Sequence, residues 1–111
     1  MDDFFYSKTG RKYYSKLMEL KKDVFDSFMI FNQKAFEAGA LEVKVKELIA
    51  VGAAHITRCP YCIDTHVQKA KKAGASDEEI AEAVFVAMAM NAGASFAHSC
   101  ISMESLSLEK G

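Results

Sequence analysis

The sequence predicts an all-α fold, a compact domain of about five to six helices. Three observations support this. Proline occurs once in 111 residues, at Pro60. No run of valine, isoleucine and threonine alternates with polar residues as in a half-buried strand. Apolar residues instead recur three and four positions apart, as on one face of a helix. With neither a repeat nor a linker, residues 1–111 are expected to form one domain. Its 50% hydrophobic content can supply a core without disulfide staples or a metal.

The first half of the chain contains three predicted helical segments. Residues 11–20 and 22–37 are expected to form two helices or one bent helix. The second segment is expected to end at Gly39, a residue suited to a helix C-cap. Its apolar residues form one stripe: Val24, Phe25, Phe28, Met29, Phe31, Ala35 and Phe36. Residues 42–57 form the next predicted helix, which is rich in large aliphatic residues such as Leu48 and Val51.

A new helix is expected at Pro60. Proline fits the first turn of a helix, where its missing N–H leaves no bond unmade. This helix is expected to run to about Ala73, with Cys59 near its N-cap and Gly74 after its end. The cysteine pair therefore lies at the N-terminus of a central helix.

The last predicted helix begins with a capping box formed by Ser76 and Glu79 and continues to about Ser99. From Ile80 onward it is apolar nearly all round, and such a helix must be covered on every side. This favours a homo-oligomer, although an internal close crossing of helices would also cover it. The methionine stripe is expected in the core: Met88 and Met90.

The charge balance argues against nucleic-acid and membrane partners. Fourteen basic and 15 acidic residues are scattered along the chain and give a net charge of −1. The N-terminus carries Asp2 and Asp3 rather than the basic and apolar regions of a secretory signal, so a cytoplasmic location is expected. The longest strictly apolar run, Ala83 to Met90, falls well short of the ~20 residues that cross a bilayer, and no membrane-spanning helix is expected.

Cys59 and Cys62 give the sharpest local signal. On one helix their Cβ atoms lie about 5 to 6 Å apart, close enough to form a disulfide. Both fall in the first turn, where free backbone N–H groups and the helix dipole favour a thiolate, the form that attacks a peroxide or a disulfide. The spacing therefore favours redox chemistry. A zinc or iron site and a pair of inert buried thiols remain alternatives.

His66 follows Cys62 by four residues and so lies one turn further along the same helix face. An imidazole in this place can accept the thiol proton and return it to a leaving group. The alternative is a solvent-exposed histidine among neighbouring lysines.

Glu47 lies on an apolar face of the helix over 42–57, where desolvation suits a carboxyl group to proton transfer. If this helix and the next fold back as a hairpin at Arg58, then Glu47, His66 and Cys62 lie roughly 15, 10 and 4 Å below the bend. This order predicts a relay from carboxylate to imidazole to thiol. A surface pair of Glu47 with Lys44 is the alternative.

The remaining histidines and the third cysteine give weaker signals. In a metal site, Cys59, Cys62 and His66 would need Cys100 or His55 as a fourth ligand, but structural zinc sites usually take ligands from turns or from two elements. Bonding of His55 to a backbone carbonyl is the commoner outcome. Packing is favoured for the other two side chains, His98 and Cys100.

Together these residues resemble the signature of the alkylhydroperoxidase D-like branch of the carboxymuconolactone decarboxylase family. The matching elements are Glu47, the motif Cys59-Pro60-Tyr61-Cys62, and His66, and the resemblance extends from about Phe25 through Ala92. It implies an all-α fold in trimers or hexamers, a thiol peroxidase activity, and an external dithiol reductant on a lipoyl or thioredoxin-like partner. Carried over by position, Glu47, Cys59, Cys62 and His66 match the family's catalytic thiols and proton relay. Tyr61 replaces a second histidine of the founding branch.

We therefore expect a cofactor-free thiol hydroperoxidase or disulfide oxidoreductase acting on a small hydroperoxide. Glu47 and His66 would deprotonate Cys62, which would become a sulfenic acid, and Cys59 would close the disulfide. The N-cap position of Cys59 leaves the reverse order open. A glutaredoxin-like fold also carries such a motif, but it requires a preceding strand and a second proline. Two further functions stay open: the family's lactone decarboxylase activity, which does not depend on a cysteine pair, and metal binding without catalysis.

Overall fold

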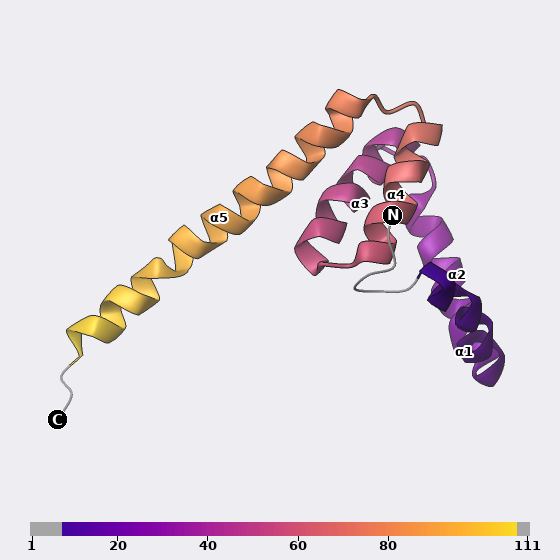
Figure 1. Cartoon of the computed structure of the whole chain (residues 1–111), viewed down its shortest axis with the longest axis horizontal. Coiled ribbons are helices and arrows are strands. Elements are labelled where there is room, and N and C mark those ends of the chain that lie inside the picture. The colour runs from indigo at the N-terminus through magenta and orange to yellow at the C-terminus, as the bar shows by residue number, and fades with distance from the viewer. Residues whose placement is uncertain (1–7, 109–111) are drawn as a thin grey trace.

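The computed structural model describes residues 8–108, and every regular element in this range is a helix. A 3₁₀ helix, η1 (Lys8–Tyr13), leads into α1 (Tyr14–Leu20) and α2 (Lys22–Phe36). They are followed by α3 (Val43–Thr57), α4 (Pro60–Lys72) and α5 (Asp77–Ser107) (Figure 1). The all-α prediction is confirmed. Within residues 8–108 no strand precedes the cysteine pair, as a glutaredoxin-like fold would require.

Helices α3 and α4 form the expected hairpin. Arg58 adopts a left-handed conformation at the bend, with φ of 59°. The Cys59 N–H donates to the carbonyl of Ala54 at 3.1 Å, and Pro60 is the first residue of α4. The chain therefore reverses direction within two residues, and α4 packs against α3.

The buried core is small and lies where α3, α4 and the start of α5 meet. Val51, Ala70 and Ala75 form its centre. The partly buried side chains around them are Leu48, Val67, Ile80, Ala83 and Val84. Gly52 permits the close approach of α3 to α5, because a Cβ atom there would lie 3.3 Å from the Ala83 carbonyl oxygen. The compact part of the fold is thus the α3–α4 hairpin with the first turns of α5.

Local signals set the connection between α4 and α5. Gly74 has a φ of 99°, and the N–H of Ala75 donates to the carbonyl of Ala70 at 2.9 Å, as in a Schellman cap. The Glu79 N–H donates to Ser76 Oγ at 3.1 Å, and the Ser76 N–H donates to the Glu79 carboxylate at 2.8 Å. Both boundary predictions, the glycine cap and the capping box, are confirmed.

Helix α2 ends at Phe36, earlier than the end predicted at Gly39, and its C-cap Glu37 is extended. The Lys46 ammonium on α3 donates to the carbonyls of Ala35, at 3.0 Å, and Glu37. Because a side chain from another helix satisfies these carbonyls, the end of α2 needs no left-handed glycine.

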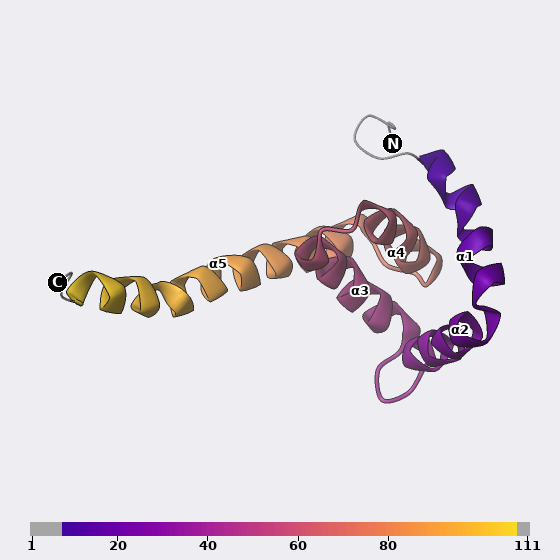
Figure 2. The same cartoon turned by 90° about the horizontal axis from the view of Figure 1, so that it is seen from below.

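The N-terminal segment forms two helices rather than one bent helix. A break at Lys21, with φ of −141°, separates α1 from α2, and Figure 2 shows the change of direction. The predicted apolar stripe on α2 is covered only in part by the chain. Its most exposed side chains are Val24, Phe28 and Phe31, and the half-buried ones are Phe25, Met29 and Phe36.

Helix α5 continues to Ser107, beyond the end predicted near Ser99. No proline or glycine occurs in residues 94–108, so no local signal stops the helix earlier. Its C-terminal half projects away from the α3–α4 hairpin in both views (Figures 1 and 2). The radius of gyration is accordingly 18.8 Å, against about 13 Å for a compact chain of about 100 residues.

Most of α5 is uncovered in the single chain. Met88 is 54% exposed and Met90 is 62% exposed, so their prediction as core residues is wrong for one chain. His98 and Cys100 are exposed as well, and the prediction that they pack inside is wrong. The reason is that the hairpin reaches only the N-terminal half of the helix, where Ala87 is its one buried residue.

Helix α5 also differs from the expectation about membranes. Its 31 residues are long and apolar enough to cross a bilayer by length and composition. The expectation was based on a strictly uninterrupted apolar run, whereas scattered Asn and Ser residues leave a helix apolar on average. One such helix is weak evidence for a membrane span, because the core helix of a soluble protein can have the same length and composition.

Candidate active site

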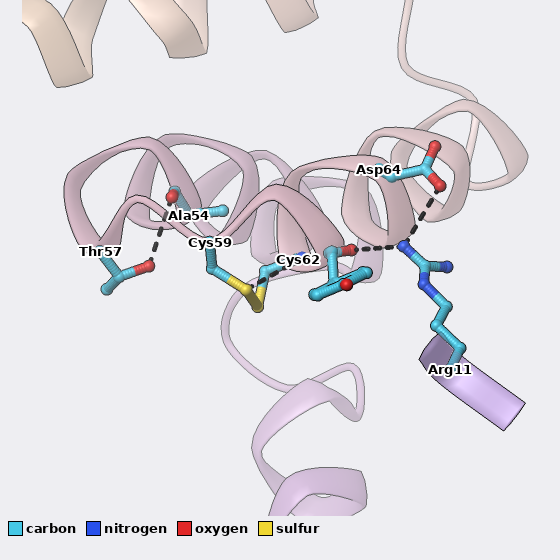
Figure 3. The surroundings of a disulfide bond; sticks show 7 residues. Arg11, Ala54, Thr57, Cys59, Cys62 and Asp64 are labelled. Carbon is cyan, nitrogen blue, oxygen red and sulfur yellow. Dashed lines mark hydrogen bonds and ion pairs between the residues drawn. A yellow bond between two sulfur atoms is a disulfide. The ribbon is translucent and has the colours of Figure 1, made fainter. Parts of the chain in front are cut away.

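The two cysteines at the start of α4 form a disulfide, shown in Figure 3. Cys59 is the N-cap and Cys62 lies in the first turn, with their Cα atoms 5.2 Å apart. The backbone N–H of Cys62 donates to Cys59 Sγ at 3.1 Å. This amide and the helix dipole favour negative charge on Cys59 once the disulfide is reduced. The predicted proximity of the two thiols is confirmed.

Glu47 and His66 meet between the two helices of the hairpin. Glu47 lies on α3 and is only 5% exposed. One of its carboxylate oxygens lies 2.6 Å from His66 Nδ1 on α4. A carboxylate only accepts hydrogen bonds, so Nδ1 carries a proton, and Nε2 is then the ring nitrogen that can act as a base when it is unprotonated. The structure thus forms the predicted carboxylate–imidazole pair. Lys44, the alternative partner of Glu47, bonds Glu79 instead, at 3.1 Å.

Phe36 stacks on one face of the His66 ring. The two rings stack with centroids 5.1 Å apart and planes 11° apart. Phe36 comes from the last turn of α2, so three helices hold the imidazole. Sequence reasoning placed Phe36 in an apolar stripe but did not connect it with His66, because no local spacing links the end of α2 to α4.

A cavity of about 500 Å³ opens beside this pair, and Cys62 and His66 lie in its wall. The other lining residues come from α2, α3 and the loop between them: Ala35, Phe36, Leu41, Lys46, Ile49, Ala50, Ala53, Ala54 and Thr57. Most of these side chains are apolar, and the volume suits a small organic molecule. The cavity therefore brings an apolar surface up to the thiol and the imidazole.

Arg11 approaches the same turn of α4 from the N-terminal segment. Its Nη2 donates to the Tyr61 carbonyl at 3.2 Å and to an Asp64 carboxylate oxygen at 3.3 Å (Figure 3). Its guanidinium carbon lies 5.1 Å from the centroid of the Tyr61 ring. Sequence reasoning missed this residue, since a single arginine in η1 carries no motif.

The remaining candidate ligands do not gather at the cysteines. His55 Nδ1 lies 2.7 Å from the Val51 carbonyl oxygen, which is the backbone bond expected for this histidine. Cys100 lies on α5 and is exposed. In residues 8–108 no three His, Cys, Asp or Glu side chains lie close enough together to hold a metal ion. The metal-binding interpretation therefore finds no ligand set in this part of the chain.

Comparisons with known proteins place the chain among relatives of uncharacterized function. A protein of Paracoccus denitrificans, "Uncharacterized protein 4 in cox locus", is 48% identical over 73 residues, 66% of this chain and 66% of that protein. The chain thus matches just under two thirds of that relative's length. An uncharacterized protein of Haemophilus influenzae is 36% identical over 100 residues, 90% of this chain and 88% of that protein.

A solved structure resembles the fold of this chain, and a family model matches its sequence. The crystal structure of TM1620 from Thermotoga maritima superposes with a TM-score of 0.66 at 26% identity, covering 91% of this chain and 99% of that one. The model of the carboxymuconolactone decarboxylase family matches residues 22–104, which include Glu47, both cysteines of α4 and His66. The chain therefore belongs to the carboxymuconolactone decarboxylase family.

Proposed function

We propose that this chain is a thiol-dependent hydroperoxidase, or disulfide oxidoreductase, with Glu47, Cys59, Cys62 and His66 as its catalytic residues. One observation carries the proposal: the Glu47–His66 pair, joined at 2.6 Å, reaches a cavity that Cys62 also lines. Membership of a family that includes such enzymes is consistent with it. The proposed substrate is a small hydroperoxide whose organic group lies against the apolar wall of the cavity.

In the first step, His66 Nε2 accepts the thiol proton of Cys62, and the Glu47 carboxylate stabilises the resulting imidazolium. The Cys62 thiolate attacks the terminal oxygen of the hydroperoxide. The S–O bond forms as the O–O bond breaks, and the departing alkoxide takes the proton back from His66. The products are an alcohol and a sulfenic acid on Cys62.

In the second step, the Cys59 thiol loses its proton and attacks the sulfur of Cys62. The S–S bond forms as the S–O bond breaks, and the hydroxyl group leaves as water with the proton from Cys59. We assign attack to Cys62 because it lines the cavity beside His66, whereas Cys59 is not among the described residues that line it. The Cys62 amide, 3.1 Å from Cys59 Sγ, favours the thiolate that resolves the intermediate.

The cycle closes when an external dithiol reduces the disulfide and is itself oxidised to a disulfide. The proposed reductant is a lipoyl or thioredoxin-like protein. No bound cofactor is required, because the two cysteine thiols supply both electrons that reduce the O–O bond.

We also propose that the chain acts in the cytoplasm as a homo-oligomer, a trimer or hexamer. The support for the homo-oligomer is the uncovered surface of α5. Its large apolar side chains that are more than half exposed are Phe85, Val86, Met88, Met90, Phe96, Ile101, Met103 and Leu106. Full burial of one such side chain contributes about 1.5–3 kcal/mol, so covering several of them with further copies stabilises an assembly.

A peroxide-consumption assay with dithiothreitol or dihydrolipoamide tests the proposed reaction. We expect turnover by the wild-type protein and losses of roughly 10²- to 10⁴-fold in Glu47→Gln and His66→Gln, which lack the proton relay. Glu82→Gln, which neutralises an exposed carboxylate on α5, is the matched control and should keep the wild-type rate. Unchanged rates in both relay variants would contradict the proposal.

A lactone decarboxylase would keep its activity without the two cysteine thiols. A Cys59→Ser and Cys62→Ser double variant that still decarboxylates a carboxymuconolactone, in a protein that consumes no peroxide, would favour that activity. Stoichiometric zinc in the purified protein would instead favour a metal-binding function.

A further inference from the structure

Cys62 and His66 also line a second, smaller cavity of about 200 Å³. Its other lining residues are Arg11, Tyr14, Tyr61 and Thr65. Each of these four side chains carries an N–H or O–H group that can donate a hydrogen bond, and among the described residues no carboxylate lines this cavity. Cys62 and His66 therefore stand between a mainly apolar cavity and one rich in hydrogen-bond donors.

Arg11 supplies the positive charge of the small cavity and is held firmly in place. Its two hydrogen bonds, to the Tyr61 carbonyl and to Asp64, both use Nη2. Its guanidinium carbon also lies within 5.1 Å of the centroid of the Tyr61 ring. Residue 11 lies outside the segment over 22–104 that the family model matches, so family membership does not account for it.

Within residues 8–108, the hydrogen bonds of the Arg11 guanidinium all use Nη2. Nη1 and Nε make no hydrogen bond to any described residue, and Nε is buried. A buried donor without an acceptor is unfavourable, so the guanidinium keeps unused hydrogen-bonding capacity next to the cavity. Asp64 offsets part of the charge, so an anion here would be recognised by directed hydrogen bonds more than by net charge.

We propose that the small cavity binds the carboxylate of a reactant, placing the reacting group of that molecule at Cys62. Its volume equals that of roughly seven water molecules, enough for a carboxylate and a short length of chain. Nη1 of Arg11 can donate to a carboxylate, and the hydroxyl groups of Tyr14 and Thr65 add donors. Two reactants could bring this group: a hydroperoxide that carries a carboxylate, or a dithiol reductant that carries one. That role as a reactant rests on the proposed function, whereas the binding site itself does not.

Binding is tested without turnover by NMR titration of the ¹⁵N-labelled protein with octanoate and with octanamide, which differ in the carboxylate. We expect octanoate to bind roughly tenfold more tightly and to shift the Arg11 Nε–H resonance and the Cys62 and Thr65 amides. Arg11→Gln should abolish the preference. Lys12→Gln, which removes an equal charge from the same helix at an exposed site outside the cavity, should retain it. Equal binding of the two ligands to the wild type, or equal loss in both variants, would overturn the proposal.

Arg11→Gln also removes the bonds that hold the N-terminal segment to α4, so a second variant tests the site with Arg11 in place. Asp64→Asn keeps an oxygen acceptor for Arg11 Nη2 but removes the competing negative charge, so octanoate binding should become tighter. Unchanged or weaker binding of octanoate to Asp64→Asn would contradict a site built on the guanidinium.

Two pairs of reactants identify which one carries the carboxylate. With tert-butyl hydroperoxide as oxidant, dihydrolipoate is compared with dihydrolipoamide. With dithiothreitol as reductant, linoleic acid hydroperoxide is compared with its methyl ester. We expect a higher kcat/KM for the acid, by roughly tenfold, in one pair, and this preference should disappear in Arg11→Gln. Equal rates in both pairs would contradict the proposed role, while absence of all turnover would contradict the peroxidase proposal and leave the NMR result to decide the binding site.

Discussion

The α3–α4 hairpin and helix α5 are neighbours in the chain, but they use their side chains in opposite ways. The hairpin encloses a charged group, Glu47, only 5% exposed and bonded to His66. Helix α5 leaves Phe96 80% exposed. The hairpin thus pairs its buried carboxylate within itself, whereas much of the apolar surface of α5 is uncovered in the single chain. Under the proposed function one chain supplies the reacting groups, and under the proposed assembly other copies cover α5.

The largest expected effect lies in the hairpin. Cys62→Ser should reduce peroxide consumption to the background rate, because a serine hydroxyl cannot form the attacking thiolate. Cys100→Ser on α5 is the matched control, since this cysteine is free and exposed. Steady-state assays of the two variants compare the regions directly. Loss of activity in Cys100→Ser but not in Cys62→Ser would contradict the assignment of the reacting thiol to the hairpin.

The second prediction concerns α5. Phe96→Glu should lower the molar mass, measured by light scattering, to that of a single chain, since a charge replaces an apolar group at an interface. The Glu47–His66 pair should stay intact, because Phe96 lies outside the core. Lys69→Glu, an exposed charge change on α4, should leave the assembly as it is. A wild-type protein that is already monomeric would rule out the proposed oligomer.

Replacing a glycine by alanine should change the stability of the protein in opposite directions in the two regions. Gly74→Ala should destabilise the protein by about 1 kcal/mol, because Gly74 has a φ of 99° at the end of α4. Gly93→Ala in the interior of α5 should stabilise it by about 0.5–1 kcal/mol, because alanine favours a helix. A Cβ atom meets no atom within 4 Å at either site in the single chain. Denaturant unfolding measures both changes. Destabilisation by Gly93→Ala would show that a second chain packs against this glycine.

The smallest expected effect is the pH dependence of the α5 capping box. The Ser76 backbone N–H, followed by the Lys44 ammonium, holds the pKa of Glu79 below its ordinary value of 4.5. A pKa that is lower in the folded state contributes stability above the unfolded value, and this stability is lost as the pH falls through the folded value. Glu79→Gln should therefore flatten the decline in stability between about pH 5 and pH 3. An unchanged slope relative to Glu82→Gln would contradict this assignment.

The parts of the fold that were predictable depend on local chemistry. Pro60 starts a helix because its ring fixes φ, and Gly74 ends one because it accepts a positive φ. The end of α2 was not predictable, since the carbonyls near Phe36 are satisfied by Lys46 from another helix. The exposure of Met88 was missed for a related reason: the sequence shows that α5 is apolar, but not which molecule covers it.

The candidate site was likewise predictable only where it depends on local sequence. The order of Glu47, His66 and Cys62 followed from the helical rise and a hairpin at Arg58, and the structure brings Glu47 and His66 into contact. The contacts of Phe36 with His66 and of Arg11 with Tyr61 join distant segments. Neither a periodicity nor a motif indicates such contacts, so they could be found only in the tertiary structure.

Single-turnover stoichiometry tests the central claim most directly. Reduced protein is mixed with one equivalent of tert-butyl hydroperoxide, without reductant, and the products are identified by mass spectrometry. The wild type should consume one hydroperoxide per chain and end as the Cys59–Cys62 disulfide. Cys59→Ser should also consume one and stop as a sulfenic acid on Cys62, while Cys62→Ser should consume none. Consumption by Cys62→Ser, with none by Cys59→Ser, would contradict the assignment of Cys62 as the attacking thiol.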